Sequence, residues 1–446
     1  MANTATLALV LATLTTFPAT AYAGNYENVV FGERSSGMGG AGIALADEPS
    51  SVFYNPAGLA QLETDIIGLS VQAGGRLAYS ADGLLRLGSQ RGSVEQTTIG
   101  AVPPSTAYVI PLGAKGAIRY AVGLSIVTPR DERLGTEQAL VDGPTTVLLA
   151  TNLVERETLA GLTFAVRVRG LHVGATLFGE YASVTFERLR SVADRAPDTD
   201  VLVTSDRRSK GQQVGLTGVL GLLYRFNERW SVGLRVRAPN LRIAGTAEHT
   251  FVQTEVGASS EQGTNITVAG VRGDMRYRHP WGIGVGTAFR SARVHVALDA
   301  RMYLPMDAYA RFGPTTDTMS WDAQVDLPAR GVVVNGALGV EAFFTRRFSL
   351  LSGLFTDAAS MSPETPVGLA GTATMHFVGA ALGVRTRSKA GTFTVSLTAR
   401  HGRGTLNSVV YDEGFARGGP ARVEQSAAIV TLSWMRSLVE DWRAPR

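Results

Sequence analysis

The stretch GMGGAGIALADEPSSVFYNPAGLA, residues 37–60, opens with three glycines in the spacing Gly37-x-Gly39-x-x-Gly42. Dinucleotide-binding loops share this spacing, but they need a buried strand before it, a helix after it and an acidic residue about 20 positions on. Here the preceding apolar segment is only VVF, and Asp47 comes too early. The glycines therefore favour tight backbone packing in another setting, which the rest of the chain has to define.

The first 23 residues, MANTATLALVLATLTTFPATAYA, predict a secretory signal peptide. An apolar core covers residues 5–17, and the small-x-small ending Ala21-Tyr22-Ala23 predicts cleavage before Gly24. This leader contains no lysine or arginine, so an uncleaved short anchor is the alternative. The chain has no cysteine, which excludes disulfides, a lipidated cysteine and thiolate metal sites, and is compatible with the bacterial envelope.

The composition favours one large closed β structure over several globular domains. The 446 residues include 51 glycines, only 18% are charged, and the net charge is +4. The positive charge is spread along the chain without basic blocks or interleaved aromatic platforms, so no nucleic-acid partner is expected. No apolar run of the chain approaches the roughly 20 residues that a membrane-spanning helix needs.

From Thr64 onward, apolar and other residues alternate with a period of two, which predicts strands and not helices. In WSVGLRVRA, residues 230–238, every second residue from Trp230 to Val236 is apolar, and the arginines lie on the other face. In RVHVALDARMYL, residues 293–304, the same pattern runs from Val294. A soluble sandwich would also produce such strands, so the connections between them have to decide.

Short and long connections alternate between these segments. The short ones are GAKG at Gly113, a break at Gly170, NER at Asn227, SA at Ser291, TRR at Thr345 and SKAG at Ser388. The long ones are polar stretches near residues 81–104, 129–148, 188–209, 250–264, 306–330, 358–374 and 404–424. Six tight turns and seven long loops predict an all-β fold, a 14-stranded antiparallel transmembrane β-barrel of the outer membrane. The even number requires residues 265–290 to form one strand, with a kink or bulge at Pro280.

Residues 31–62, FGERSSGMGGAGIALADEPSSVFYNPAGLAQL, closely resemble the N-terminal region of the FadL/TodX family, the outer-membrane transporters of long-chain fatty acids and aromatic hydrocarbons. Later fragments, such as AVGLSIVTP and HPWGIGVGTAFRSARVHVALDARM, resemble that family's strand pairs in the same order. The resemblance implies a barrel whose lumen is plugged by an N-terminal hatch. The expected parts are the signal peptide at 1–23, the hatch at 24–62, the barrel at 63–438 and a periplasmic C-terminal tail at 439–446.

A hatch has a physical purpose here. The lumen of a 14-stranded barrel is too wide for its own side chains to fill, so without a plug it would be a water-filled pore. Pro56 fixes its own φ and biases Asn55 toward an extended conformation. A capping segment without a gating role is the alternative. The residues assigned to the hatch are Gly37, Gly39, Gly40, Gly42, Asp47, Asn55, Pro56, Ala57, Gly58 and Leu59.

The resemblance also implies a function, the passive uptake of hydrophobic solutes. A solute would be captured among extracellular loops, enter an apolar pocket above the hatch and leave sideways where the third strand, residues 117–128, kinks inward. Gly123 is the candidate for the flexible position in that strand. The loops at 188–209 and 250–264 are shorter and more polar than in family members with a surface capture site. They keep open an alternative, a non-transporting barrel accessory of an envelope secretion or assembly system.

Charged residues on the inward face of the strands are the remaining candidates. One or two arginines could bind a substrate carboxylate, or the group could form an ion-paired network. The candidates are Arg235, Arg237, Asp299, Arg301 and Arg385. No Gly-x-Ser-x-Gly motif occurs, and the six histidines lack the spacing of a metal or triad site, so no enzyme, cofactor or metal is expected.

Three partners are expected. They are the hydrophobic solute, the outer-membrane lipid with its lipopolysaccharide, and the barrel-assembly machinery. The last strand, near residues 425–438, offers Trp434 as the aromatic residue of an assembly signal, and Trp442 in the tail is the other candidate.

Overall fold

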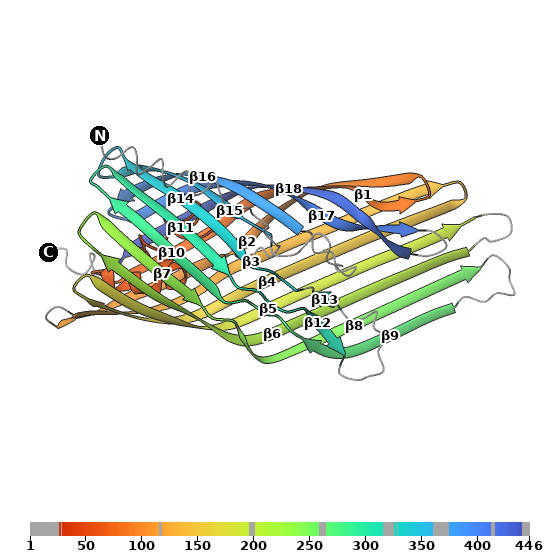
Figure 1. Ribbon diagram of the computed structural model, residues 1–446, viewed down its shortest axis with the longest axis horizontal. Coiled ribbons are helices and arrows are strands. Elements are labelled where there is room, and N and C mark those ends of the chain that lie inside the picture. Colours follow the sequence, from red (N-terminus) through yellow and green to blue (C-terminus); the bar gives the residue numbers. More distant parts are fainter. Residues whose placement is uncertain are drawn as a thin grey trace.

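The computed structural model describes residues 26–27, 29–115, 118–195, 201–257, 265–314, 325–327, 329–359, 374–411 and 415–438. Most of these residues form a single closed sheet whose successive strands pair antiparallel (Figure 1). At the outer rim, residues 85–87 also pair in parallel with residues 409–411. The first and last strands close it, because Ile66 pairs with Ser437 and the ladder continues to Asp82 and Arg422. Among the described residues, no helix is long and apolar enough to cross a membrane.

The sheet contains 18 strand segments, of which eight are the halves of four interrupted wall strands, so the barrel wall has 14 strands, as predicted. In chain order the segments are β1 (Ile66–Leu87), β2 (Gln90–Lys115), β3 (Ile118–Asp142), β4 (Thr145–Val168), β5 (Leu171–Asp194), β6 (Val201–Arg225), β7 (Trp230–Arg237), β8 (Leu241–Gly257), β9 (Asn265–Met275), β10 (Gly282–Arg290), β11 (Val294–Tyr303), β12 (Tyr309–Pro314), β13 (Val325–Leu327), β14 (Val333–Phe343), β15 (Phe348–Asp357), β16 (Thr374–Ser388), β17 (Gly391–Tyr411) and β18 (Phe415–Ser437).

The four interruptions lie side by side. They separate β7 from β8, β9 from β10, β11 from β12 and β13 from β14, and they begin beyond one continuous row of pairs that runs from Arg237 through Gly282 and Tyr303 to Val333. Pro239, Pro280 and Pro305 fall in the first three gaps, and proline cannot donate a ladder hydrogen bond. The predicted interruption at Pro280 is therefore one of a set.

The short connections that the sequence predicts lie at the rim where β1 begins and β18 ends. In the described residues they occupy positions 169–170, 226–229, 291–293, 344–347 and 389–390, which agrees with the predicted turns. The turn after Gly113 falls on residues 116–117, outside the described part. By the rule for outer-membrane barrels, this rim is periplasmic.

The prediction of long loops is mostly wrong, because strands occupy much of these stretches. Residues 81–104 and 129–148 form the outer halves of β1 to β4, joined by turns of two residues, and residues 188–209 and 404–424 also lie largely in strands. Strands of 22 to 26 residues such as β1 and β2 exceed the 9–11 residues that cross a bilayer, so they continue well past it (Figure 1). Beyond the bilayer the outward face of a strand meets water and no longer has to be apolar, which weakens the alternation that identifies a strand. The stretches at 250–264, 306–330 and 358–374 lie partly outside the described residues.

The outer surface of the barrel is apolar near the periplasmic rim. Trp230 and Val232 are 48% and 43% exposed, whereas Ser231 between them is buried, as are Arg235 and Arg237 further along β7. This is the orientation that the alternation predicts. A soluble protein would bury the apolar face and expose the charges. The opposite arrangement, over a closed wall, is that of an outer-membrane barrel.

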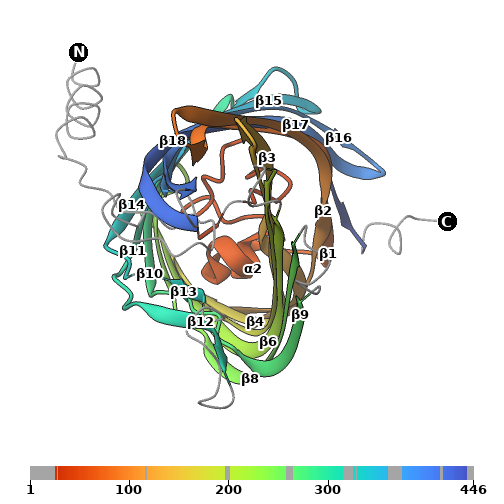
Figure 2. The same cartoon turned by 90° about the vertical axis from the view of Figure 1, so that its right-hand side faces the viewer.

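The N-terminal segment fills the lumen. The described residues between Tyr26 and Leu62, called the plug below, contain the short helix α2 (Ser51–Tyr54) and the 3-10 helix η1 (Pro56–Gln61), and nearly all of them are buried. Figure 2 looks along the barrel from the end opposite the short turns and shows α2 and the coils of the plug enclosed by the strands.

Candidate functional site

Asn55 joins three parts of the molecule. Its backbone is extended, and its side-chain Oδ1 accepts a hydrogen bond from the amide of Ala57 at 3.2 Å, which caps η1. Its Nδ2 donates to the carbonyl of Ile43 in the plug at 2.7 Å and to the carbonyl of Leu222 in β6 at 3.0 Å. Pro56 follows as the first residue of η1, where its missing N–H costs nothing. The Asn-Pro pair therefore fixes the plug both to itself and to the wall.

The wall beneath the plug is lined by glycines. A Cβ on Gly221 of β6 would overlap Oδ1 of Asn55, and one on Gly174 of β5 would stand 2.5 Å from the amide nitrogen of Ala57. A Cβ on Gly353 of β15 would stand 2.5 Å from the amide nitrogen of Gly39. At these positions the plug backbone lies directly on the strand backbone. Sequence reasoning missed these wall glycines, although they sit on the inward-facing positions of their strands.

The plug glycines serve the same close packing. Gly39 and Gly40 have φ angles of +64° and +82°, which other residues rarely adopt. A Cβ on Gly37 would stand 2.6 Å from the side chain of Leu351 in β15, and one on Gly58 would overlap the carbonyl of Ala46. The glycine-rich stretch is thus explained by packing geometry.

Charged wall residues hold the glycine-rich turn. Oδ2 of Asp299 in β11 accepts hydrogen bonds from the backbone amides of Gly42 at 2.7 Å and Ile43 at 3.0 Å. The guanidinium of Arg301, two residues on, donates to the carbonyl of Gly40. Asp47 pairs with Arg34 within the plug. Asp299 and Arg301, predicted to face the lumen, therefore bind the plug backbone.

Glu341 of β14 is a second anchor for the plug. Its carboxylate forms ion pairs with Nε of Arg34 at 2.9 Å and with Nη1 of Arg385 in β16 at 3.3 Å. The side chain of Glu341 is fully buried. Of these three residues the sequence predicts only Arg385 as a lumen residue, and it does not single out Arg34 or Glu341.

Glu27 anchors the beginning of the plug. Its carboxylate lies 3.0 Å from Arg235, 3.6 Å from Arg237 and 4.0 Å from Arg301. Burial alone would raise the pKa of Glu27, but the three guanidinium groups outweigh it and hold the pKa at about 2. Glu27 is therefore an anion at neutral pH, and the predicted lumen arginines are its partners.

A second buried charge group lies beside this one. Nε2 of His279, in the gap between β9 and β10, stands 3.1 Å from Glu157 and 3.0 Å from Glu180, while Arg237 donates to Glu157 at 2.6 Å and Asn240 donates to Glu180 at 2.7 Å. The two carboxylates and the imidazole are, within the described residues, the one group whose donors could hold a metal ion. Because Arg237 and Asn240 already occupy these carboxylates, the arrangement is that of an ion-paired network.

Above the charged groups the lumen is apolar. One cluster contains Phe186, Met275 and Phe312, a second contains Tyr79, Met375 and Phe377, and Leu134 of β3 packs against both. A third cluster, toward the outer rim, gathers side chains from opposite parts of the wall: Leu85, Leu87, Val147, Leu149, Val192 and Val409. Two basic side chains also touch the first cluster, since Arg188 lies over the ring of Phe186 and His249 packs edge-on against Phe312. The described lumen above the plug is therefore lined mainly, but not entirely, by apolar side chains.

The wall has a seam between β2 and β3. These strands pair only from Thr106 to Lys115 on β2 and from 118 to 126 on β3, although both continue much further outward. The register of β3 against β4 shifts between Val127 and Arg130, and the carbonyl of Pro129 in this bulge accepts a hydrogen bond from the plug amide of Val29 at 3.2 Å. Above the bulge, side chains span the seam: a Cβ on Gly135 would stand 3.2 Å from Nε2 of Gln96.

Gly123, the predicted flexible position, lies below the seam. It pairs regularly with Val109 and Thr163, and a Cβ there would stand 3.2 Å from Leu59 of the plug. The irregular part of the strand begins four residues later, at Val127.

No protein-family model matches the sequence, and no curated protein matches it. Solved structures do resemble it. A FadL homologue of Pseudomonas aeruginosa superposes with a TM-score of 0.64 at 14% identity, covering 92% of this chain and 99% of the other. The toluene transporter TodX of Pseudomonas putida gives 0.61 at 16% identity over 91% and 98%, and the toluene transporter TbuX of Ralstonia pickettii gives 0.58 at 15% over 92% and 99%. The plugged 14-stranded barrel described above is therefore the fold of the FadL/TodX outer-membrane channels.

Proposed function

We propose that this protein is a passive outer-membrane channel for hydrophobic solutes. The observation that carries the proposal is the apolar lining of the lumen above the plug, which ends beside a seam in the wall. Apolar solutes gain free energy by leaving water for such a lining. They also displace no hydrogen bonds there, since the clusters consist of aliphatic and aromatic side chains.

The proposed route starts at the outer rim. A solute parts the rim cluster around Leu85 and Val147 and passes between the two inner clusters at Leu134. It leaves sideways at the lower end of the seam between β2 and β3, where pairing resumes at Thr106 and Ile126 and the wall enters the bilayer. The plug closes the route below, because its backbone is fixed to the wall by Asn55 and by Asp299. Lateral exit spares the solute the charged groups at Glu27 and Glu157.

Small aromatic hydrocarbons are the proposed solutes, with long-chain fatty acids as the other class. The lumen clusters join side chains from opposite parts of the wall. A small ring displaces fewer of these packed contacts than a long acyl chain does. The resemblance to solved structures of toluene transporters supports the same choice.

Uptake of labelled toluene and labelled oleate tests the proposal, in cells that lack the protein and in cells that express it. We expect toluene uptake to rise with expression and Leu134→Asp to abolish the rise, because the carboxylate would be desolvated by each passing solute. Val141→Asp is the matched control, since Val141 lies on the same strand and is 62% exposed. If neither solute enters faster with the wild-type protein, the channel proposal fails. The accessory role in a secretion or assembly system is then the better hypothesis.

A further inference from the structure

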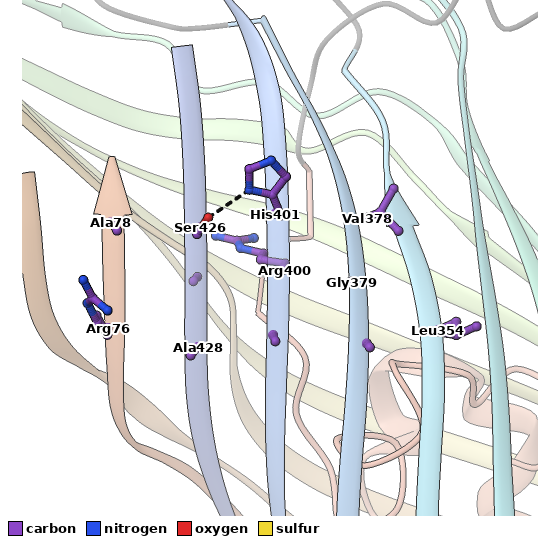
Figure 3. Close-up of a pocket in the computed structure, with 12 residues that line it drawn as sticks. Arg76, Ala78, Leu354, Val378, Gly379, Arg400, His401, Ser426 and Ala428 are labelled. Atoms are coloured by element: carbon purple, nitrogen blue, oxygen red, sulfur yellow. Dashed lines mark hydrogen bonds between the residues drawn. The ribbon is translucent and has the colours of Figure 1, made fainter. Parts of the chain in front are cut away.

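The outer face of the barrel carries a groove that the transport route does not use. It lies across β1, β15, β16, β17 and β18 and has a volume of ≈ 410 Å³ (Figure 3). Its floor is formed by the small side chains of Ala78, Ala380, Ala399 and Ala428, and Leu354 and Val378 border it. We propose that this groove binds one acyl chain of lipid A, with a lipid A phosphate at Arg76 and His401.

The groove faces the bilayer. On β16 and β17 its neighbours Leu382, Val395 and Leu397 are 59%, 53% and 49% exposed, which places them in the apolar outer band of the barrel. The residues between them on each strand are buried toward the lumen. An apolar depression in such a surface is filled by lipid.

The height of the groove places its charged end at the outer leaflet. Phe393 and Trp434, whose ring centroids are 6.4 Å apart, mark the periplasmic boundary near the start of β17 and the end of β18. Arg76 and His401 lie ten residues beyond the starts of their strands, at Ile66 and Gly391. Since 9–11 residues cross the bilayer, both side chains lie at its outer boundary. The outer leaflet there consists of lipopolysaccharide.

Of the three basic residues that line the groove, Arg400 lies over the ring of Phe377, while Arg76 and His401 are arranged to receive an anion. His401 and Arg76 are both exposed, and Nδ1 of His401 is bonded to Oγ of Ser426 at 2.9 Å, as the dashed line in Figure 3 shows. When Ser426 donates this bond, the imidazole carries its proton on Nε2, which is then the donor available to a ligand. None of the described residues that line the groove is acidic. An arginine and an imidazole above an alkyl groove match a phosphate attached to acyl chains.

Native mass spectrometry of the full-length protein in detergent, titrated with bisphosphorylated hexa-acyl lipid A, tests the site. We expect one tightly bound lipid A, and about tenfold weaker binding in the double variant R76A/H401A, because charge-assisted hydrogen bonds to the phosphate are lost. The variant A399L/A428L fills the floor and is expected to lose the tight site. Arg403→Ala is the control, since Arg403 is exposed on the same wall, pairs with Glu424 and does not line the groove.

Two further probes separate the sources of the ligand. Lipid A without phosphates is expected to bind as weakly to the wild type as the bisphosphorylated form does to R76A/H401A. Equal binding of phosphatidylglycerol and lipid A would overturn the assignment to lipid A, and unchanged binding in R76A/H401A would overturn the site. The heat-modifiable mobility of each variant on a gel establishes that it is folded, and if A399L/A428L does not fold, R76A/H401A decides.

Discussion

The two halves of the barrel are closed in different ways. In the half that crosses the membrane, the plug lies backbone to backbone on wall glycines such as Gly221 and is held by hydrogen bonds and ion pairs. In the outer half, large apolar side chains around Leu134 meet across the lumen, and the wall is unpaired between β2 and β3. Contacts of the first kind are specific and costly to break, whereas apolar contacts can be exchanged for contacts with a solute. The proposed route therefore runs through the half whose contacts a solute can replace, and it leaves the plug in place.

Locking the seam is expected to have the largest effect. In the variant Q96C/G135C, a short bifunctional thiol reagent joins β2 to β3 above the bulge, and toluene uptake is expected to fall to that of cells without the protein. The chain contains no other cysteine, so the reaction is specific. G135C/N152C is the control, because it joins the same residue to its ladder partner on β4, where the wall is already closed. Full uptake after cross-linking Q96C/G135C would show that solutes do not leave through the seam.

Displacing the plug comes next. Gly221→Leu places a side chain where Asn55 lies, and overpacking of this kind costs about 1–3 kcal/mol. The leak of small hydrophilic solutes through the barrel is expected to rise roughly ten- to hundredfold, measured as conductance in planar bilayers. Gly218→Ala, on the same strand, leaves a Cβ 3.4 Å from its nearest neighbour and should conduct like the wild type. If the Gly221→Leu variant conducts no more than the wild type, the position of the plug does not depend on this contact.

Weakening the charged anchor should loosen the plug less. Asp299→Asn keeps one acceptor for the amides of Gly42 and Ile43 but removes the charge, a loss of about 1.5 kcal/mol. A single cysteine at Ser36, which is fully buried in the plug, is then expected to react with a maleimide about tenfold faster. Asp206→Asn, on an exposed ion pair with Arg208, is the control. Equal labelling rates in S36C and S36C/D299N would exclude Asp299 as an anchor.

Acidification should have the smallest effect near neutral pH. The pKa of Glu27 is about 2 in the folded protein, below its ordinary value of 4.5, so its ion pairs stabilise the plug fully above pH 4.5. That contribution is lost as the pH falls from 4.5 through 2, and bilayer conductance should rise over this range and not between pH 5 and 7. Glu27→Gln removes the contribution at every pH. A conductance step that persists unchanged in this variant would assign the titration to another group.

Much of this architecture could be predicted from the chain. Alternation with a period of two predicts the strand segments that cross the membrane, because there one face of a strand meets lipid and the other meets the lumen. It also placed Arg235, Arg237, Asp299 and Arg301 inside. The outer strand extensions could not be predicted in this way, since outside the bilayer neither face has to be apolar.

The partners of the inward charges could not be predicted either. Glu27 meets Arg235 across 208 positions of the chain, and Asp299 meets Gly42 across 257. No local pattern records such pairings. The wall glycines are a different case: a glycine on the inward face of several consecutive strands is a signal that a backbone approaches, and Gly174, Gly221 and Gly233 all carry it.

The row of interruptions at Pro239, Pro280 and Pro305 has a mechanical consequence. Below it, β7, β10, β11 and β14 form an unbroken ladder around the plug, and above it β8, β9, β12 and β13 form another. Twist is passed along a strand by its continuous backbone geometry. A change of twist in the outer segments is therefore absorbed at this row. On the proposed route, a solute can therefore displace the outer segments while the ladder around the plug keeps its shape.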